Sequence, residues 1–106
     1  MKNAIGLLAY DREQVFAFGL MHLRGCGPLT LESISLWLCE QCPGIHDGNR
    51  ATASREFIRD ALRRRIVCRY DSDEPAAYDI SDSRKAANVI EEYRAGSREA
   101  AGRDKK

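Results

Sequence analysis

The stretch that decides the fold is residues 52–70, TASREFIRDALRRRIVCRY, in which the hydrophobic period changes. Its apolar side chains first recur at helical spacing on one side of a helical wheel: Phe57, Ile58, Ala61, Leu62 and Ile66. The opposite side carries Thr52, Glu56, Arg59 and Arg63, with Arg55 on its flank. From Ile66 onward the pattern is typical of a strand. These residues therefore predict a helix over 52–65 that runs directly into a strand over 66–70.

Two further helices are predicted on the N-terminal side. Asp11 is suited to cap the first helix, and Gln14 stands three residues later, as a capping box requires. The apolar run of this helix covers 15–24, and the glycines and proline at 25–28 are expected to end it. Thr30 is suited to cap the second, over 31–42, which residues 43–44, Pro-Gly, end. A link of about nine residues, 43–51, then leads to the third helix.

On the C-terminal side, the strand over 66–70 is followed by a turn at 71–75 and a returning strand at 76–80. Ser81 or Asp82 is suited to cap a last helix over 82–95, and Gly96 is expected to end it. The chain thus divides into an apolar extension at 1–10, a domain at 11–95 and a charged tail at 96–106 that we expect to be disordered.

Three segments resemble the winged helix-turn-helix superfamily, which includes small MarR-like and PadR-like DNA-binding regulators. They are 29–34 (LTLESI), 55–67 (REFIRDALRRRIV) and 77–81 (AYDIS), at the start of the second helix, the third helix and the end of the hairpin. The resemblance implies a mainly α fold with a β-hairpin: a three-helix core, a two-stranded wing and a C-terminal helix. It also implies a sequence-specific, transcription-regulating DNA-binding protein, of phage or mobile-element scale. The long link and an acidic wing tip at 71–74 depart from the family pattern.

Charge is segregated along the chain although the total is only +1. Residues 50–69 hold seven arginines against Glu56 and Asp60, whereas residues 70–82 hold five acids and no base. The net charge favours neither a nucleic acid nor a membrane as the partner. No apolar segment reaches the roughly 18 residues of a membrane span. Because Asp11 follows the short apolar start where a secretory signal would have a cleavage site, we expect a cytoplasmic protein without a membrane partner.

The arginine-rich helix is the candidate contact with double-stranded DNA. If it enters the major groove, Arg55, Arg59 and Arg63 can fork onto guanine or clamp phosphate. Thr52 and Glu56 would select bases. The phosphate contacts would come from the arginines just before and after the helix, Arg50 and Arg69. An acidic protein surface or a merely solvated face are the alternatives, although the i, i+4 arginines repel one another.

Cysteine and histidine spacing offers a zinc site as an alternative to core packing. Cys39, Cys42 and His46 have plausible zinc spacing, and His22 and Cys26 would complete another set with the two cysteines. Because Cys39 and Cys42 lie within a predicted helix, we expect buried core thiols and no metal. A redox-sensing thiol is a third possible role for these cysteines. No nucleophile and base occur in a catalytic motif, so we expect neither an enzyme nor a cofactor.

Apolar residues in the extension, Ile5, Leu7, Leu8 and Tyr10, have no evident place in a three-helix core. They favour a homodimer that presents two DNA-binding helices, or else they fold back over the monomer. An alternative function is a protein interaction module on the same fold, such as an accessory subunit or a phage-encoded inhibitor of host machinery. Its partner would dock at the acidic wing.

Overall fold

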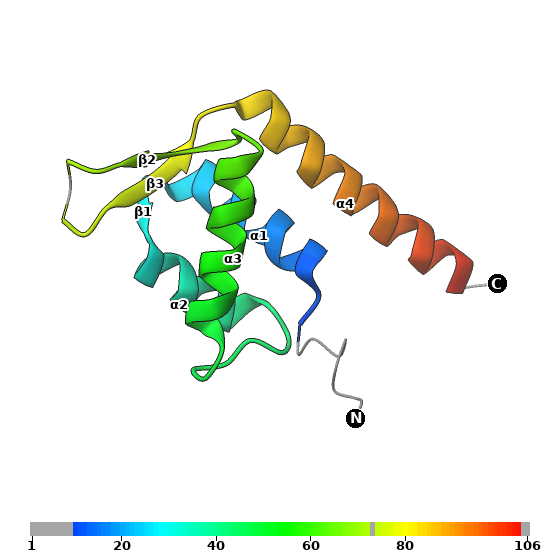
Figure 1. The fold of residues 1–106 in the computed structure, drawn as a ribbon. Helices are drawn as coiled ribbons and strands as arrows, with labels where there is room; N and C mark the ends of the chain where they lie inside the picture. Colours follow the sequence, from blue (N-terminus) through cyan, green and yellow to red (C-terminus); the bar gives the residue numbers. More distant parts are fainter. Residues whose placement is uncertain (1–9, 73, 105–106) are drawn as a thin grey trace.

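The computed structural model describes residues 10–72 and 74–104, which form a mainly helical α+β fold with a small antiparallel sheet (Figure 1). The helices of this part are α1 (Arg12–Cys26), α2 (Leu31–Gln41), α3 (Arg50–Arg63) and α4 (Ser83–Asp104). The strands are β1 (Leu29–Thr30), β2 (Val67–Tyr70) and β3 (Ala77–Ile80). Apart from the short β1, the elements follow the predicted order of three helices, a hairpin and a last helix.

The hairpin predicted after the third helix is confirmed, but it belongs to a three-stranded sheet in the order β1-β3-β2. Val67 pairs with Ile80 and Tyr70 with Ala77 in the hairpin, and Leu29 pairs with Tyr78 on the other side of β3. The expectation of only two strands is therefore wrong. A strand of two residues has no period that a sequence can reveal, and β1 exists because β3 pairs with it.

The predicted N-caps of the first two helices are confirmed. A carboxylate oxygen of Asp11 accepts hydrogen bonds from the N–H groups of Glu13 and Gln14 at 2.9 and 3.3 Å, and Thr30 Oγ1 accepts from the N–H of Ser33 at 3.2 Å. Gln14 does not complete the capping box. Its side-chain amide donates instead to the Tyr93 hydroxyl at 3.3 Å, which ties the start of α1 to α4.

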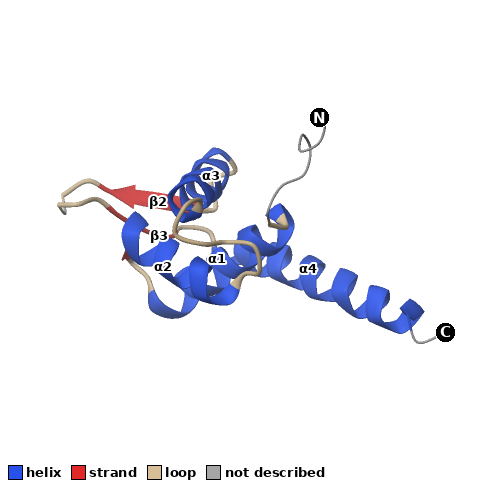
Figure 2. Cartoon of the chain, turned by 90° about the horizontal axis from the view of Figure 1, so that it is seen from below, coloured by secondary structure: helices blue, strands red, loops and turns tan. Residues whose placement is uncertain are grey.

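The core lies where α1, α2 and α3 meet beside the sheet, and α4 packs along α1 (Figures 1 and 2). Its fully buried large side chains include Leu20, Leu23, Ile34, Leu38, Ile66 and Ile90. Phe16 of α1 meets Phe57 of α3 edge to face, with ring centroids 5.7 Å apart. The α1–α3 contact is close because Gly19 leaves room for the Phe57 ring. This packing fixes which side of α3 faces solvent.

Three predicted helix boundaries are wrong: both ends of α3 and the C-terminal end of α4. Helix α3 begins at Arg50 and ends at Arg63 instead of spanning 52–65. Helix α4 continues through Gly96 to Asp104, so the expected disordered tail is helical as far as Asp104. Glycine in a helix costs only about 1 kcal/mol relative to alanine, and the alanines and charged residues on both sides of Gly96 are good helix formers.

The apolar extension lies outside the described residues except for Tyr10, so Ile5, Leu7 and Leu8 have no described position. Within residues 10–72 and 74–104, no helix is long and apolar enough to cross a membrane.

Candidate functional site

The outward side of α3 carries an exposed surface that we call the α3 face: Thr52, Arg55, Arg59 and Arg63. The opposite side of the helix is buried through Ala53, Phe57, Ile58 and Ala61. Because the buried stripe is anchored in the core, the arginines project into solvent. The structure therefore brings these four predicted residues together on one surface.

Arg55 and Arg59 differ from Arg63 in their partners. Among the described residues, no carboxylate forms an ion pair with Arg55 or Arg59. Arg63 contacts Asp60 at 2.7 Å, although its side chain remains 74% exposed. An exposed pair of this kind contributes at most about 1 kcal/mol, so Arg63 can exchange its partner for an external anion.

Glu56 does not belong to the α3 face, and the expectation that it faces outward with the arginines is wrong. Its carboxylate accepts a hydrogen bond from the Tyr10 hydroxyl at 3.1 Å and lies 3.7 Å from the Arg12 guanidinium. Burial, followed by the hydrogen bond to Glu56, raises the pKa of Tyr10. Glu56 therefore connects α3 to the start of α1 instead of pointing away from the protein.

Arg50 is likewise placed differently from its prediction, since it is the first residue of α3 and not a free arginine ahead of it. Its guanidinium donates to Ser35 Oγ at 2.6 Å and to Glu32 at 3.2 Å, and its Nε lies 3.4 Å from Asp47. The side chain is only 23% exposed. Arg50 thus joins α2 to the start of α3, and a phosphate contact would have to disrupt these interactions.

Arg69 lies on β2, and its Nε forms an ion pair with Asp71 at the base of the hairpin turn. Ser72 and Glu74 are exposed there, and Asp73 lies outside the described residues. The hairpin extends away from the helices (Figure 1). The ion pair leaves Arg69 less available to an external phosphate than the arginines of the α3 face.

The cysteines and histidines do not gather. Cys42 is 3% exposed in the core, and burial, with a smaller effect of the Asp11 charge, raises its pKa to about 11. Cys39 is partly buried, whereas Cys26 and His46 are exposed. His22 stacks on Trp37 with ring centroids 4.4 Å apart, and burial lowers the pKa of this imidazole. Within the described part of the chain, no three His, Cys, Asp or Glu side chains converge on a point that could hold a metal.

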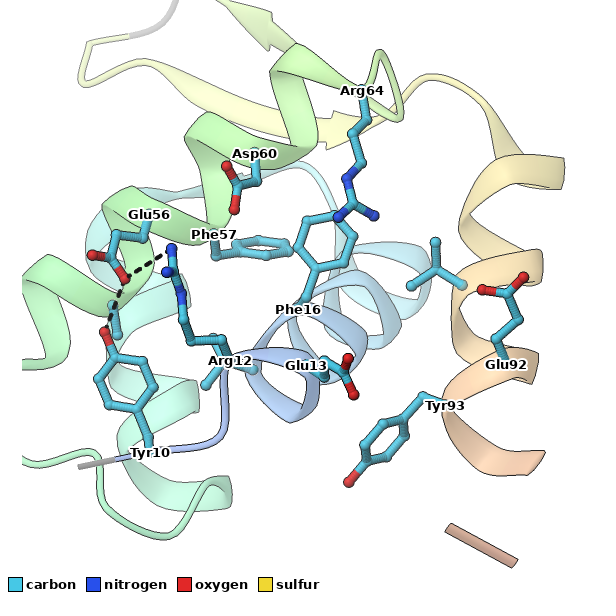
Figure 3. A pocket seen from close by; sticks show the side chains of 13 residues that line it. Tyr10, Arg12, Glu13, Phe16, Glu56, Phe57, Asp60, Arg64, Glu92 and Tyr93 are labelled. Atoms are coloured by element: carbon cyan, nitrogen blue, oxygen red, sulfur yellow. Dashed lines mark hydrogen bonds and ion pairs between the residues drawn. The ribbon is translucent and has the colours of Figure 1, made fainter. Parts of the chain in front are cut away.

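A cavity of about 550 Å³ between α1, α3 and α4 was not foreseen from the sequence. Figure 3 shows its walls, which combine aromatic rings with charged side chains. The residues lining it are Tyr10, Arg12, Glu13, Val15, Phe16, Ala53, Glu56, Phe57, Asp60, Arg64, Val89, Glu92 and Tyr93. No sequence signal marks them as a group, because they come from three helices and the segment before α1.

Comparisons with known protein families, with curated proteins and with solved structures gave no match.

Proposed function

We propose that the protein is a sequence-specific DNA-binding transcriptional regulator with a winged helix-turn-helix fold, in which α3 enters the major groove. The observation that carries this proposal is the α3 face, where Arg55 and Arg59 are exposed and lack a carboxylate partner among the described residues. Guanidinium groups fork onto guanine and bind phosphate, so such a surface suits DNA.

The spacing of the arginines supports an anionic partner. Arg55 and Arg59, like Arg59 and Arg63, are four residues apart on one helix, where like charges repel by a few tenths of a kcal/mol. A nucleic acid backbone would remove this repulsion. Thr52 to Arg63 spans roughly 16 Å at 1.5 Å per residue, and an α-helix fits within the major groove.

The structure narrows the set of proposed contacts. We propose that the DNA contacts come from Thr52, Arg55, Arg59 and Arg63. Glu56 and Arg50 instead position α3, through their contacts to Arg12 and to α2. Arg69 is a secondary phosphate contact, because Asp71 already pairs with it. A cytoplasmic homodimer would present two such helices to the two halves of a palindromic site.

A second candidate function is a protein interaction module. It is favoured by the hairpin tip, where Asp71 and Glu74 are exposed and would be repelled by phosphate. If DNA is the partner, the tip must lie away from the backbone. If the tip docks to a protein, the α3 face need not contact nucleic acid at all.

The decisive experiment is fluorescence anisotropy with random duplex DNA over a salt series. Each phosphate neutralised contributes about 0.9 to the slope of log K against log salt, so three arginines that all bind phosphate would give a slope near −2.7 per protomer. We expect Arg59→Ala to weaken binding by about 1–3 kcal/mol if the residue forks onto a base. If it contacts phosphate, the slope should fall by about 1 instead.

The matched control is Arg24→Ala, which removes another exposed arginine, from the last turn of α1. It should change DNA binding far less than Arg59→Ala. A salt slope near zero for the parent protein, or equal losses in the two variants, would contradict the proposal.

The hairpin tip separates the two functions. Asp71→Asn together with Glu74→Gln removes two negative charges that are exposed in the structure. A DNA-binding protein with the tip near the duplex should gain non-specific affinity and a steeper salt slope. No DNA binding by either form, together with loss of a captured protein on substitution, would favour the interaction module.

A further inference from the structure

The cavity between α1, α3 and α4 is a second feature that could bind a ligand. Val15 and Phe16 of α1, Ala53 and Phe57 of α3, and Val89 of α4 line it. Tyr10 and Tyr93 add two more aromatic rings. Its volume of about 550 Å³ lies within the range of roughly 300–1,000 Å³ that small-molecule sites occupy. It is therefore large enough for an aromatic molecule of two or three rings.

The charges that line the cavity favour a cation. Glu13, Glu56, Asp60 and Glu92 stand against Arg12 and Arg64, which leaves an excess of two negative charges among the lining residues. Figure 3 shows Glu13 and Glu92 reaching toward the cavity from α1 and α4, across from Asp60 on α3.

The carboxylates of the cavity are not equivalent. Glu56 is paired with Arg12 and Asp60 with Arg63. Among the described residues, no arginine, lysine or histidine forms an ion pair with Glu13 or Glu92. These two carboxylates are therefore the ones that an external cation would meet.

The aromatic wall already accepts a positive charge. The Arg64 guanidinium lies over the Phe16 ring, 4.5 Å from its centroid. The face of an aromatic ring attracts cations, and Tyr93 and Tyr10 offer further rings in the same cavity. A ligand that combines a flat aromatic body with a positive charge would match both the walls and the carboxylates.

We propose that this cavity binds an organic cation with an aromatic body. The aromatic part would lie against Val89 and Tyr93, because Arg64 already covers the face of Phe16 and Phe57 is only 3% exposed. The positive charge would lie near Glu13 and Glu92. An anion of the same size would meet the excess negative charge, so charge sign should decide which ligand binds. This inference concerns the cavity alone and does not depend on whether α3 contacts DNA.

The test is a fluorescence titration of the full chain with two aromatic dyes of opposite charge, in the absence of DNA. Thioflavin T is the cation, and 8-anilinonaphthalene-1-sulfonate is the anion. We expect saturable binding of thioflavin T that is tighter than binding of the anion. Saturable binding of the anion with equal or greater affinity would overturn the proposal, as would no binding of the cation.

Two sets of variants locate the dye. Glu13→Gln combined with Glu92→Gln should weaken thioflavin T binding about twofold to thirtyfold, since both carboxylates are exposed and an exposed charge pair is worth at most about fivefold in affinity. The control is Glu40→Gln, an exposed glutamate of α2 that is not among the lining residues. Equal affinities in the double variant and the control would place the dye elsewhere and overturn the proposal.

A filling variant gives an independent readout. Val89 is partly buried and lines the cavity from α4, so Val89→Trp should occupy the space of the aromatic body. We expect thioflavin T binding to be lost while far-UV circular dichroism shows the parent helix content. Parent affinity in a folded Val89→Trp protein would contradict the proposed location.

Discussion

Gly19→Ala tests the packing that orients α3. A Cβ on Gly19 would lie 2.6 Å from both Cε1 and Cζ of Phe57, a distance that carbon atoms do not tolerate. Phe57 is itself 3% exposed and is held edge to face by Phe16, so its ring can yield only toward the cavity that it lines. Overpacking of a well-filled core costs about 1–3 kcal/mol, whereas the helix preference for alanine over glycine returns about 1 kcal/mol. We expect a net loss of up to about 2 kcal/mol.

The same helix contains its own control. Gly25 is in α1, and a Cβ there would have no neighbour within 4 Å. Gly25→Ala should therefore stabilise the protein by up to about 1 kcal/mol through helix preference alone. Both variants gain similar stability from the helix preference of alanine over glycine. The difference between their free energies of unfolding therefore gives the cost of overpacking at Gly19.

Urea unfolding followed by far-UV circular dichroism measures both variants, provided that the slope against urea stays constant. A second comparison adds Phe57→Leu, whose smaller side chain should reduce the penalty of Gly19→Ala and show coupling between the two positions. If Gly19→Ala stabilises the protein as much as Gly25→Ala does, the close approach of α1 and α3 is not as described, and the orientation of the α3 face loses its support.

Three further predictions concern stability and the thiols. Arg50→Ala should lower the free energy of unfolding by about 1–2 kcal/mol because Ser35 and Glu32 lose a hydrogen-bond donor. Arg55→Ala should change the free energy of unfolding by no more than about 0.5 kcal/mol. Equal effects of the two variants in urea unfolding would contradict the assigned roles. The raised pKa of Cys42 means that the unfolded chain loses this proton before the folded one does, so stability should fall from about pH 9 to about pH 11. The fall should be smaller in Cys42→Ala, and an unchanged pH profile would refute the assignment. We also expect a chelator to leave the circular dichroism spectrum unchanged and elemental analysis to find less than one zinc per chain. One tightly bound zinc per chain, with unfolding on its removal, would contradict the prediction that the cysteines are not metal ligands.

The order of the main elements and several of their boundaries could be predicted from the sequence. Asp11 and Thr30 were identified as helix caps because capping depends on a side chain and the backbone two or three residues away. The buried stripe of α3 followed from helical periodicity, and so did the exposure of Arg55 and Arg59 on its other side. The hairpin followed from a change of period around a turn. Each of these depends on interactions between residues that are close in the chain.

Only the tertiary structure decided which charged residues of α3 remain available. Glu56 and Arg59 are equally polar in the sequence, but Tyr10 binds Glu56 from 46 residues away, and Arg12 lies beside it. Arg50 was indistinguishable from the other arginines until α2 placed Glu32 and Ser35 against it. The pairing of β1 with β3 and the cavity between α1, α3 and α4 depend in the same way on segments far apart in sequence. Periodicity assigns a residue to a side of a helix, but which partner it meets there is set by how the helices pack.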